Sequence, residues 1–161
     1  YTEENTLSLH DALPIFYQRL IAADLTLVPG VGPFVRSLHT EGVRLAIVSA
    51  ARREEIIHVL TIAGLVDCFV GIVAAEDVTR TKPDPEGYLK GLALLGLPTS
   101  ACVVVEDSVP GLRAARAAGM PVAMLTTSHS RAELEREQPA SIWADFLDHQ
   151  PLELPWLPTS S

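Results

Sequence analysis

Features that are scarce in this 161-residue sequence argue against several classes of protein. Its two cysteines, Cys68 and Cys102, are too few for a disulfide framework, and both lie in apolar stretches where we expect reduced core residues of a cytoplasmic protein. The sequence has only 12 Lys and Arg but 20 Asp and Glu, which gives a net charge of −8. This charge, together with the lack of a run of basic residues, argues against a nucleic-acid partner. The longest apolar runs are strand-sized, which argues against a membrane-spanning segment.

Two common kinds of catalytic site are also missing from the pattern. His39 and His58 fall within helix-like stretches and His129 lies in a Thr/Ser-rich loop, and their spacing does not indicate a zinc site. We therefore expect these three histidines to be structural or exposed to solvent. No G-x-S-x-G sequence occurs, so the pattern does not indicate a serine hydrolase either.

What the sequence does contain is typical of one α/β domain. It is 48% hydrophobic and 20% charged, and helix-like and strand-like periods alternate along most of it. Apolar strands separated by helices of about ten residues predict a parallel sheet with helices on both faces. We expect helices at 31–41, 52–63, 85–95, 109–118 and 131–137, and strands at 44–49, 69–74, 101–106, 121–126 and 141–144.

Three motifs place polar side chains where these strands end. They are IVSAAR at 47–52, TKPDPEGY at 81–88 and VVVEDSVPGLRAARAAG at 103–119. In open parallel sheets, ligands bind beyond the carboxyl ends of the strands. Ser49 ends one strand, Lys82 lies in the loop after the next, and Glu106 with Asp107 ends the third. We therefore expect these four side chains to converge on one edge of the sheet.

The acids and the lysine suit phosphate chemistry, although each has a simpler interpretation. Glu106 and Asp107 offer carboxylate oxygens to a hard cation such as Mg²⁺, which takes few protein ligands. The alternative is that Asp107 or Ser108 caps the following helix. Lys82 is followed by Pro-Asp-Pro, which stiffens the loop, and a fixed ammonium can neutralise a transferring phosphoryl group. The alternative is a solvated loop lysine.

The segment around Ser49 has the features of an anion site. Ser49 offers a hydroxyl, Ala50 and Ala51 leave their backbone N–H groups accessible, and a predicted helix starts near Arg52 with its positive end nearby. An ordinary helix N-cap at Ser49 is the alternative.

Together these motifs resemble the haloacid dehalogenase superfamily, most of all its β-phosphoglucomutases, phosphoglycolate phosphatases and sugar phosphatases. The resemblance runs from about residue 28 to residue 146. It implies a Rossmann-like α/β core in which Ser49 and Ala50 bind phosphate, Lys82 stabilises developing charge, and Glu106 and Asp107 hold Mg²⁺ directly or through water. It also implies a small phosphorylated metabolite as substrate, above all a sugar phosphate, and an aspartyl-phosphate intermediate. Phosphatase and mutase remain alternatives, and the oligomeric state stays open.

The resemblance further implies a D-x-D-G-T motif that carries the nucleophile, followed by a helical cap, and neither is found here. The upstream acid Asp11 has Leu13 two positions later and no following glycine, so we do not assign it the nucleophile's role. We expect the sheet to lack its central nucleophile strand and to carry two open edges in its middle. This chain alone is then expected to be inactive. It would be either a module that binds phosphate and Mg²⁺ without turnover or a truncated product without function.

The sequence TLSLHDALPI at 6–15 matches the translation of a sequencing-library adaptor. We interpret residues 1–16 as an artefactual leader, 17–27 as the remnant of a cap helix, 28–146 as the core and 147–161 as a tail.

This interpretation predicts what the source DNA encodes upstream of Tyr17. The uninterrupted frame should continue into a helical cap and a D-x-D-G-T motif, because the rest of the motif set is present. Sequencing that region directly from the source organism is the measurement. A genomic frame that itself encodes TLSLHDALPI would refute the adaptor hypothesis.

Overall fold

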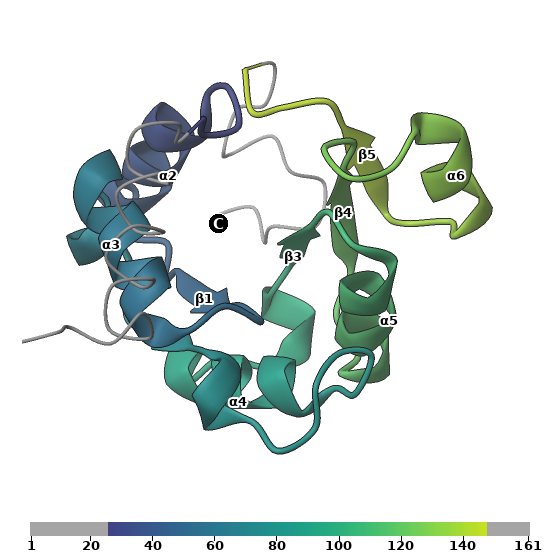
Figure 1. Cartoon of the computed structure of the whole chain (residues 1–161), viewed down its shortest axis with the longest axis horizontal. Helices are drawn as coiled ribbons and strands as arrows, with labels where there is room; N and C mark the ends of the chain where they lie inside the picture. The colour runs from purple at the N-terminus through teal and green to yellow at the C-terminus, as the bar shows by residue number, and fades with distance from the viewer. Residues whose placement is uncertain (1–25, 148–161) are drawn as a thin grey trace, which may run out of the picture.

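The strands form two small parallel sheets rather than one. The structure, a computed structural model, describes residues 26–147. The first sheet pairs β1 (Ala46–Val48) with β2 (Gly71–Val73). The second has the order β3 (Val104–Glu106), β4 (Val122–Leu125), β5 (Ser141–Trp143). Within the described residues β1 and β3 do not pair, and no described strand lies between them (Figure 1).

Helices connect the strands where the hydrophobic periodicity predicts them. They are α2 (Val31–Thr40), α3 (Arg53–Ala63), α4 (Glu86–Leu95), α5 (Val109–Ala117) and α6 (Arg131–Arg136), with short 3-10 turns η1 (Val66–Cys68), η2 (Ala75–Asp77) and η3 (Thr99–Ala101). Both α3 and α4 end on a left-handed glycine, Gly64 with φ 64° and Gly96 with φ 62°. A side chain would strain that backbone conformation, so glycine is the natural terminator at both positions.

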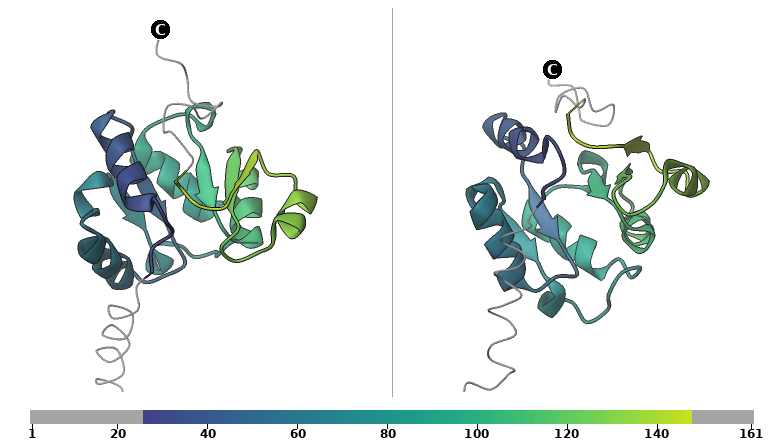
Figure 2. Two further views of the ribbon diagram at one scale, coloured as in Figure 1. Left: turned by 90° about the horizontal axis from the view of Figure 1, so that it is seen from above. Right: turned by 45° about the horizontal axis from the view of Figure 1, so that its top comes forward.

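Two helices span the gap between the sheets, one on each face (Figure 2). On one face, α2 packs Phe34 and Leu38 with β4 and β5, and packs Val35 with α3 beside the β1–β2 sheet. On the other face, α4 contacts β1, β2 and α5, and its Tyr88 is buried with residues of β3 and α5. Helix packing therefore holds the two sheets together where a backbone ladder does not.

Strand β4 shows why the helices must cover both faces. Its four residues are all buried, and successive side chains point to opposite faces. Val122 and Met124 pack with α5 and α6, whereas Ala123 and Leu125 pack with α2. This confirms the fold class predicted from the continuous apolar strands, a parallel α/β arrangement with two covered faces.

Several other expectations can be compared with the structure. Cys68 and Cys102 are buried free thiols, as predicted, and burial raises the pKa of Cys102. No helix in the described range 26–147 combines the length and apolarity needed to cross a membrane. The proposed leader with Asp11, most of the proposed cap remnant at 17–27 and nearly all of the tail lie outside the described residues.

Leu112 provides a test of the core. Its side chain is fully buried between α5 and the second sheet, so Leu112→Ala should lower the free energy of unfolding by about 2–5 kcal/mol. Leu89 on α4 is 50% exposed, and Leu89→Ala is the matched control with an expected change within about 0.5 kcal/mol. Urea unfolding of the two variants beside the unmodified chain measures both. Equal losses would contradict this assignment of the core.

Candidate active site

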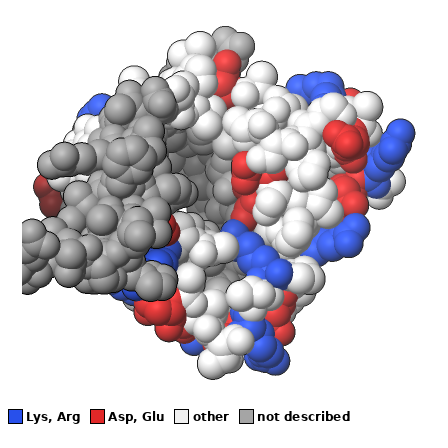
Figure 3. All heavy atoms as spheres, viewed as in Figure 1, with Lys and Arg blue, Asp and Glu red and all other residues white. Residues whose placement is uncertain are grey.

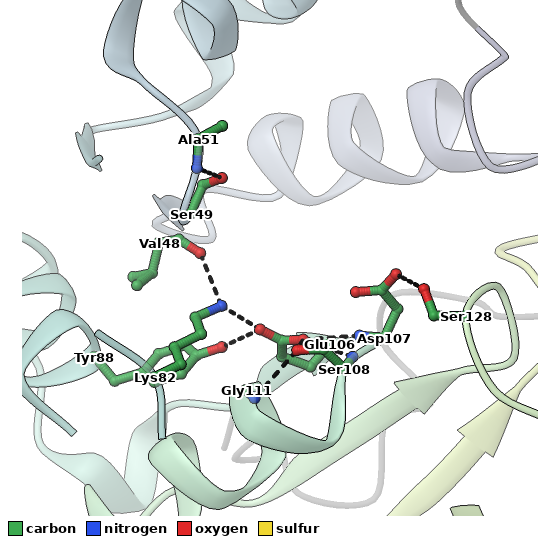
Figure 4. A network of polar contacts seen from close by, with 10 residues as sticks. All are labelled: Val48, Ser49, Ala51, Lys82, Tyr88, Glu106, Asp107, Ser108, Gly111 and Ser128. Atoms are coloured by element: carbon green, nitrogen blue, oxygen red, sulfur yellow. Dashed lines mark hydrogen bonds and ion pairs between the residues drawn. The ribbon is translucent and has the colours of Figure 1, made fainter. Parts of the chain in front are cut away.

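Lys82 connects the two sheets at their carboxyl edge (Figure 4). Its ammonium forms an ion pair with the Glu106 carboxylate at the end of β3, and donates to the Val48 carbonyl at the end of β1, 3.4 Å away. It also lies 5.0 Å from the centre of the Tyr88 ring on α4. The predicted convergence of Lys82 and Glu106 is therefore confirmed, and the alternative of a solvated loop lysine is wrong, because this side chain is only 20% exposed.

Glu106 is buried, and both of its oxygens accept hydrogen bonds. Oε1 accepts from Lys82 and, at 2.8 Å, from the Tyr88 hydroxyl. Oε2 accepts from the backbone N–H groups of Asp107 and Ser108 and from the Ser108 hydroxyl, each at 2.9 Å. Burial acts to raise the pKa of Glu106, but Lys82 and the other donors outweigh it and hold that pKa below its ordinary value. The carboxylate is thus ionised and already satisfied by protein groups.

The start of α5 is built around this carboxylate. Ser108 is the N-cap residue and its side chain accepts a hydrogen bond from the Gly111 N–H, so the capping alternative is correct for Ser108. A Cβ at Gly111 would lie 2.0 Å from the carboxyl group of Glu106, so only glycine fits there. The positive end of α5 adds to the field that favours the ionised carboxylate.

Asp107 follows Glu106 but points the other way (Figure 4). Its Oδ2 accepts hydrogen bonds from the hydroxyls of Ser128 and Thr127, the latter at 3.2 Å, both in the loop after β4. Among residues 26–147, no hydrogen bond involves its Oδ1. Asp107 therefore keeps an oxygen that can bind a cation, whereas Glu106 does not offer one.

Ser49 lies at the same edge, next to the Val48 carbonyl that Lys82 contacts (Figure 4). Its N–H donates to Val73 in the β1–β2 ladder, and its hydroxyl oxygen accepts from the Ala51 N–H at 3.0 Å. The N-cap of α3 is Arg52, so the N-cap alternative for Ser49 is wrong. The Ser49 hydroxyl hydrogen and the exposed Ala50 N–H, which has no acceptor in the described range, are both available to an anion.

Four residues of this network were missed by sequence reasoning or given other roles. Tyr88 lies in the second motif, six residues after Lys82 and within the helix expected at 85–95, but no role was predicted for it from the sequence. Thr127 and Ser128 directly follow β4 and lie at the same edge. They could have been found from the sequence, because ligands bind beyond the carboxyl ends of parallel strands. For Ser108 the sequence predicts only a possible role as the cap of the following helix. Burial and Glu106 together raise the pKa of Tyr88, so its hydroxyl stays protonated as a donor.

No part of the described range holds three or more His, Cys, Asp or Glu side chains in a metal-binding group. Within that range His39, His58 and His129 belong to no such group. Figure 3 shows that this face of the molecule is hollowed, with acidic and basic side chains along the rim of the hollow. A cation here would need most of its ligands from water or from a bound phosphate, which is the usual situation of Mg²⁺.

Comparisons with known proteins agree on one family. The chain matches the haloacid dehalogenase-like hydrolases over residues 2–119. It is 36% identical over 131 residues to protein CbbY of Rhodobacter capsulatus, which covers 78% of this chain and 57% of that protein. It is also 36% identical over 110 residues to hexitol phosphatase B of Escherichia coli K12, covering 64% of this chain and 50% of that protein.

A solved structure supports the same assignment. CbbY from Rhodobacter sphaeroides, in complex with phosphate, superposes with a TM-score of 0.74 at 25% identity, covering 91% of this chain and 68% of that one. The sequences therefore agree over a range that includes all three motifs, and the folds agree over most of the described residues. The chain spans only about half the length of the curated relatives named above. It belongs to the haloacid dehalogenase-like hydrolases.

Proposed function

We propose that this chain carries the phosphate- and magnesium-binding part of a cytoplasmic phosphatase or phosphomutase that acts on a small phosphorylated metabolite, a sugar phosphate above all. The observation that carries the proposal is the Lys82 ammonium, held between Glu106 and the end of β1. A fixed cation at the carboxyl edge of a parallel sheet suits the transfer of a phosphoryl group. Relatives named as a hexitol phosphatase and as a phosphate complex of CbbY support it.

Phosphate would be bound between Lys82 and the turn after β1. The Ser49 hydroxyl and the Ala50 N–H offer hydrogen-bond donors, and the start of α3 contributes its positive end. Lys82 would neutralise the charge that develops on the phosphoryl oxygens. Because Glu106 compensates part of that positive charge, it acts as a positioning residue for Lys82.

The residues present fit Mg²⁺ with one direct ligand. Asp107 has an oxygen that accepts no hydrogen bond from a described residue, so we propose it as that ligand, oriented by Ser128 and Thr127. Glu106 would contribute negative charge, and act at most through water, because its oxygens already accept five hydrogen bonds. Bound Mg²⁺ supplies charge neutralisation at the phosphate.

A nucleophile is the part that the described residues do not supply. Family membership implies attack by an aspartate of a D-x-D-G-T motif, with water or a sugar hydroxyl then accepting the phosphoryl group, and residues 26–147 contain no such motif. The second candidate function is therefore a module that binds phosphate and Mg²⁺ without turnover. Among residues 26–147 no strand pairs with the facing edges of β1 and β3, which favours it for this chain by itself.

Ligand-linked stability and turnover distinguish these functions. Mg²⁺ with inorganic phosphate should raise the melting temperature, since a ligand at a hundredfold excess over its Kd stabilises by about 2.7 kcal/mol. Asp107→Asn should remove the Mg²⁺ contribution and Lys82→Met the phosphate contribution. Lys90→Met changes the only other lysine and should keep both. A melting temperature that changes with neither Mg²⁺ nor phosphate would contradict the proposed site.

The same samples are assayed for hydrolysis of a chromogenic phosphate ester. For this chain alone we expect no Mg²⁺-dependent turnover, because the nucleophile motif is absent. Turnover that disappears in Asp107→Asn would overturn that expectation and establish catalysis by the chain itself.

The buried ion pair also predicts how stability depends on pH. The folded-state pKa of Glu106 lies below its ordinary value of 4.5, so its ionised form stabilises the fold above pH 4.5, and this contribution is lost as the pH falls from there toward the folded-state pKa. Glu106→Gln should therefore cost about 3–5 kcal/mol near pH 7, with a smaller difference from the unmodified chain below pH 4.5. Urea unfolding at a series of pH values measures it.

The control for this series is Glu54→Gln. Glu54 forms an exposed ion pair with Arg52, and such pairs contribute about 0–1 kcal/mol. Equal losses of stability in both variants at every pH would mean that the Lys82–Glu106 pair contributes no more than an exposed ion pair.

A further inference from the structure

The loop that carries Lys82 closes on the first residue of the helix that follows it. That residue is Glu86, which begins α4, and its carboxylate contacts the chain before Lys82. Oε1 accepts a hydrogen bond from the Thr79 N–H at 3.0 Å, and Oε2 accepts from the Thr79 hydroxyl and the Arg80 N–H, each at 2.9 Å. Lys82 therefore lies inside a loop whose two ends are joined by one side chain.

The Glu86 carboxylate serves this loop rather than its own helix. The N-cap of α4 is Pro85, whose side chain accepts no hydrogen bond, and the N–H of Glu86 itself donates to Asp84 Oδ1 at 2.9 Å. Lys90, one turn further along α4, also donates to Oε1 of Glu86, at 2.7 Å. The Lys90 ammonium and the N–H and hydroxyl of Thr79 hold the pKa of Glu86 well below its ordinary value. The carboxylate is therefore ionised at neutral pH, although the side chain is only 12% exposed.

The chain ahead of this loop is fixed to the turn after β1, where phosphate is proposed to bind. The Ala75 N–H in η2 donates to the Ala51 carbonyl at 3.0 Å. Asp77, the last residue of η2, accepts a hydrogen bond from the guanidinium of Arg53 at the start of α3. These contacts define the position of η2 relative to Ser49, so only the short segment between η2 and the lysine is left to be positioned.

That segment, residues 78–81, belongs to no helix or strand. In the described range the N–H groups of Thr79 and Arg80 donate only to the Glu86 carboxylate. Without that acceptor these N–H groups would turn to water, and the segment would lose its fixed conformation. The Lys82 ammonium, on a flexible four-carbon stem, would then lose its fixed position as well.

We propose that Glu86 is a positioning residue for the phosphate site, whose carboxylate holds the loop so that the Lys82 ammonium stays where a phosphoryl group can bind it. That place is between Val48 and Glu106 (Figure 4). This role of Glu86 rests on the proposed function of Lys82 in binding phosphate. Glu86 does not contact the ligand and acts through the backbone of the loop alone. Because a misplacement of about 1 Å can remove most of the effect of a charged group, loss of Glu86 should weaken phosphate binding strongly.

The proposed magnesium site should be independent of this loop. Asp107 lies at the end of β3 and is oriented by Thr127 and Ser128 in the loop after β4. No hydrogen bond between described residues links these three to residues 78–86. A change at Glu86 should therefore separate the two ligands, weakening phosphate binding while Mg²⁺ binding is kept. General destabilisation of the fold would not produce this difference.

A matched pair of variants tests the proposal. Glu86→Gln and Lys90→Met both remove the ion pair between these two residues, but only the first changes the contacts to the loop. A carboxamide has one acceptor oxygen, so the new side chain must turn its NH₂ group toward the N–H of Thr79 or Arg80. We expect the Kd for inorganic phosphate to rise about tenfold or more in Glu86→Gln and to stay unchanged in Lys90→Met, with Mg²⁺ binding kept in both. Melting temperatures titrated with each ligand measure these constants.

The lysine content of the chain allows a direct spectroscopic test. Lys82 and Lys90 are its only lysines, so labelling lysine with ¹⁵N yields two ammonium signals, and Lys90→Met leaves that of Lys82. Because the Lys82 ammonium is ion-paired and mostly buried, its protons should exchange slowly with water in the unmodified chain and in Lys90→Met. Glu86→Gln should speed this exchange about tenfold or more in the absence of phosphate.

Equal phosphate affinity and equal exchange of the Lys82 ammonium in Glu86→Gln and Lys90→Met would overturn the proposal. If Glu86→Gln does not fold, backbone hydrogen exchange of the unmodified chain decides. The amides of Thr79 and Arg80 should then exchange about tenfold or more slowly than free amides, and unprotected amides would also overturn the proposal. Failure of the unmodified chain to bind phosphate would instead contradict the proposed function of Lys82, and the exchange of its ammonium would still show whether Glu86 positions it.

Discussion

The ion pair between Lys82 and Glu106 is the contact on which the arrangement of this domain depends. No backbone ladder joins the two sheets within the described residues, where the packing of α2 and α4 and this polar bridge connect them. Both partners are largely removed from water, at 20% and 7% exposure. Removing one would leave an uncompensated buried charge, which is far more costly than the loss of an exposed pair. The bridge therefore fixes the spacing of the two strand ends as well as the position of the ammonium.

The adjacent carboxylates of Glu106 and Asp107 lie in different surroundings. Glu106 is turned inward, where the start of α5 and the absence of a side chain at Gly111 make room for it. Asp107 points the other way, and one of its oxygens accepts no hydrogen bond from a described residue. Because side chains alternate along a strand and its extension, one acid of such a pair must face the interior and the other the ligand. A single strand end thus serves both the structure and the proposed chemistry.

Much of this could be predicted from the sequence because it depends on local patterns. Hydrophobic periodicity located every described helix and strand. The tendency of ligands to bind beyond the carboxyl ends of parallel strands predicted that Lys82 and Glu106 lie close together. The sequence could not show which acid faces inward, since that depends on α5 amides folding back over the strand end. Tyr88 was missed for a similar reason, because only the tertiary structure brings its hydroxyl to the carboxylate. The open edges were expected from the missing motif rather than from any local pattern.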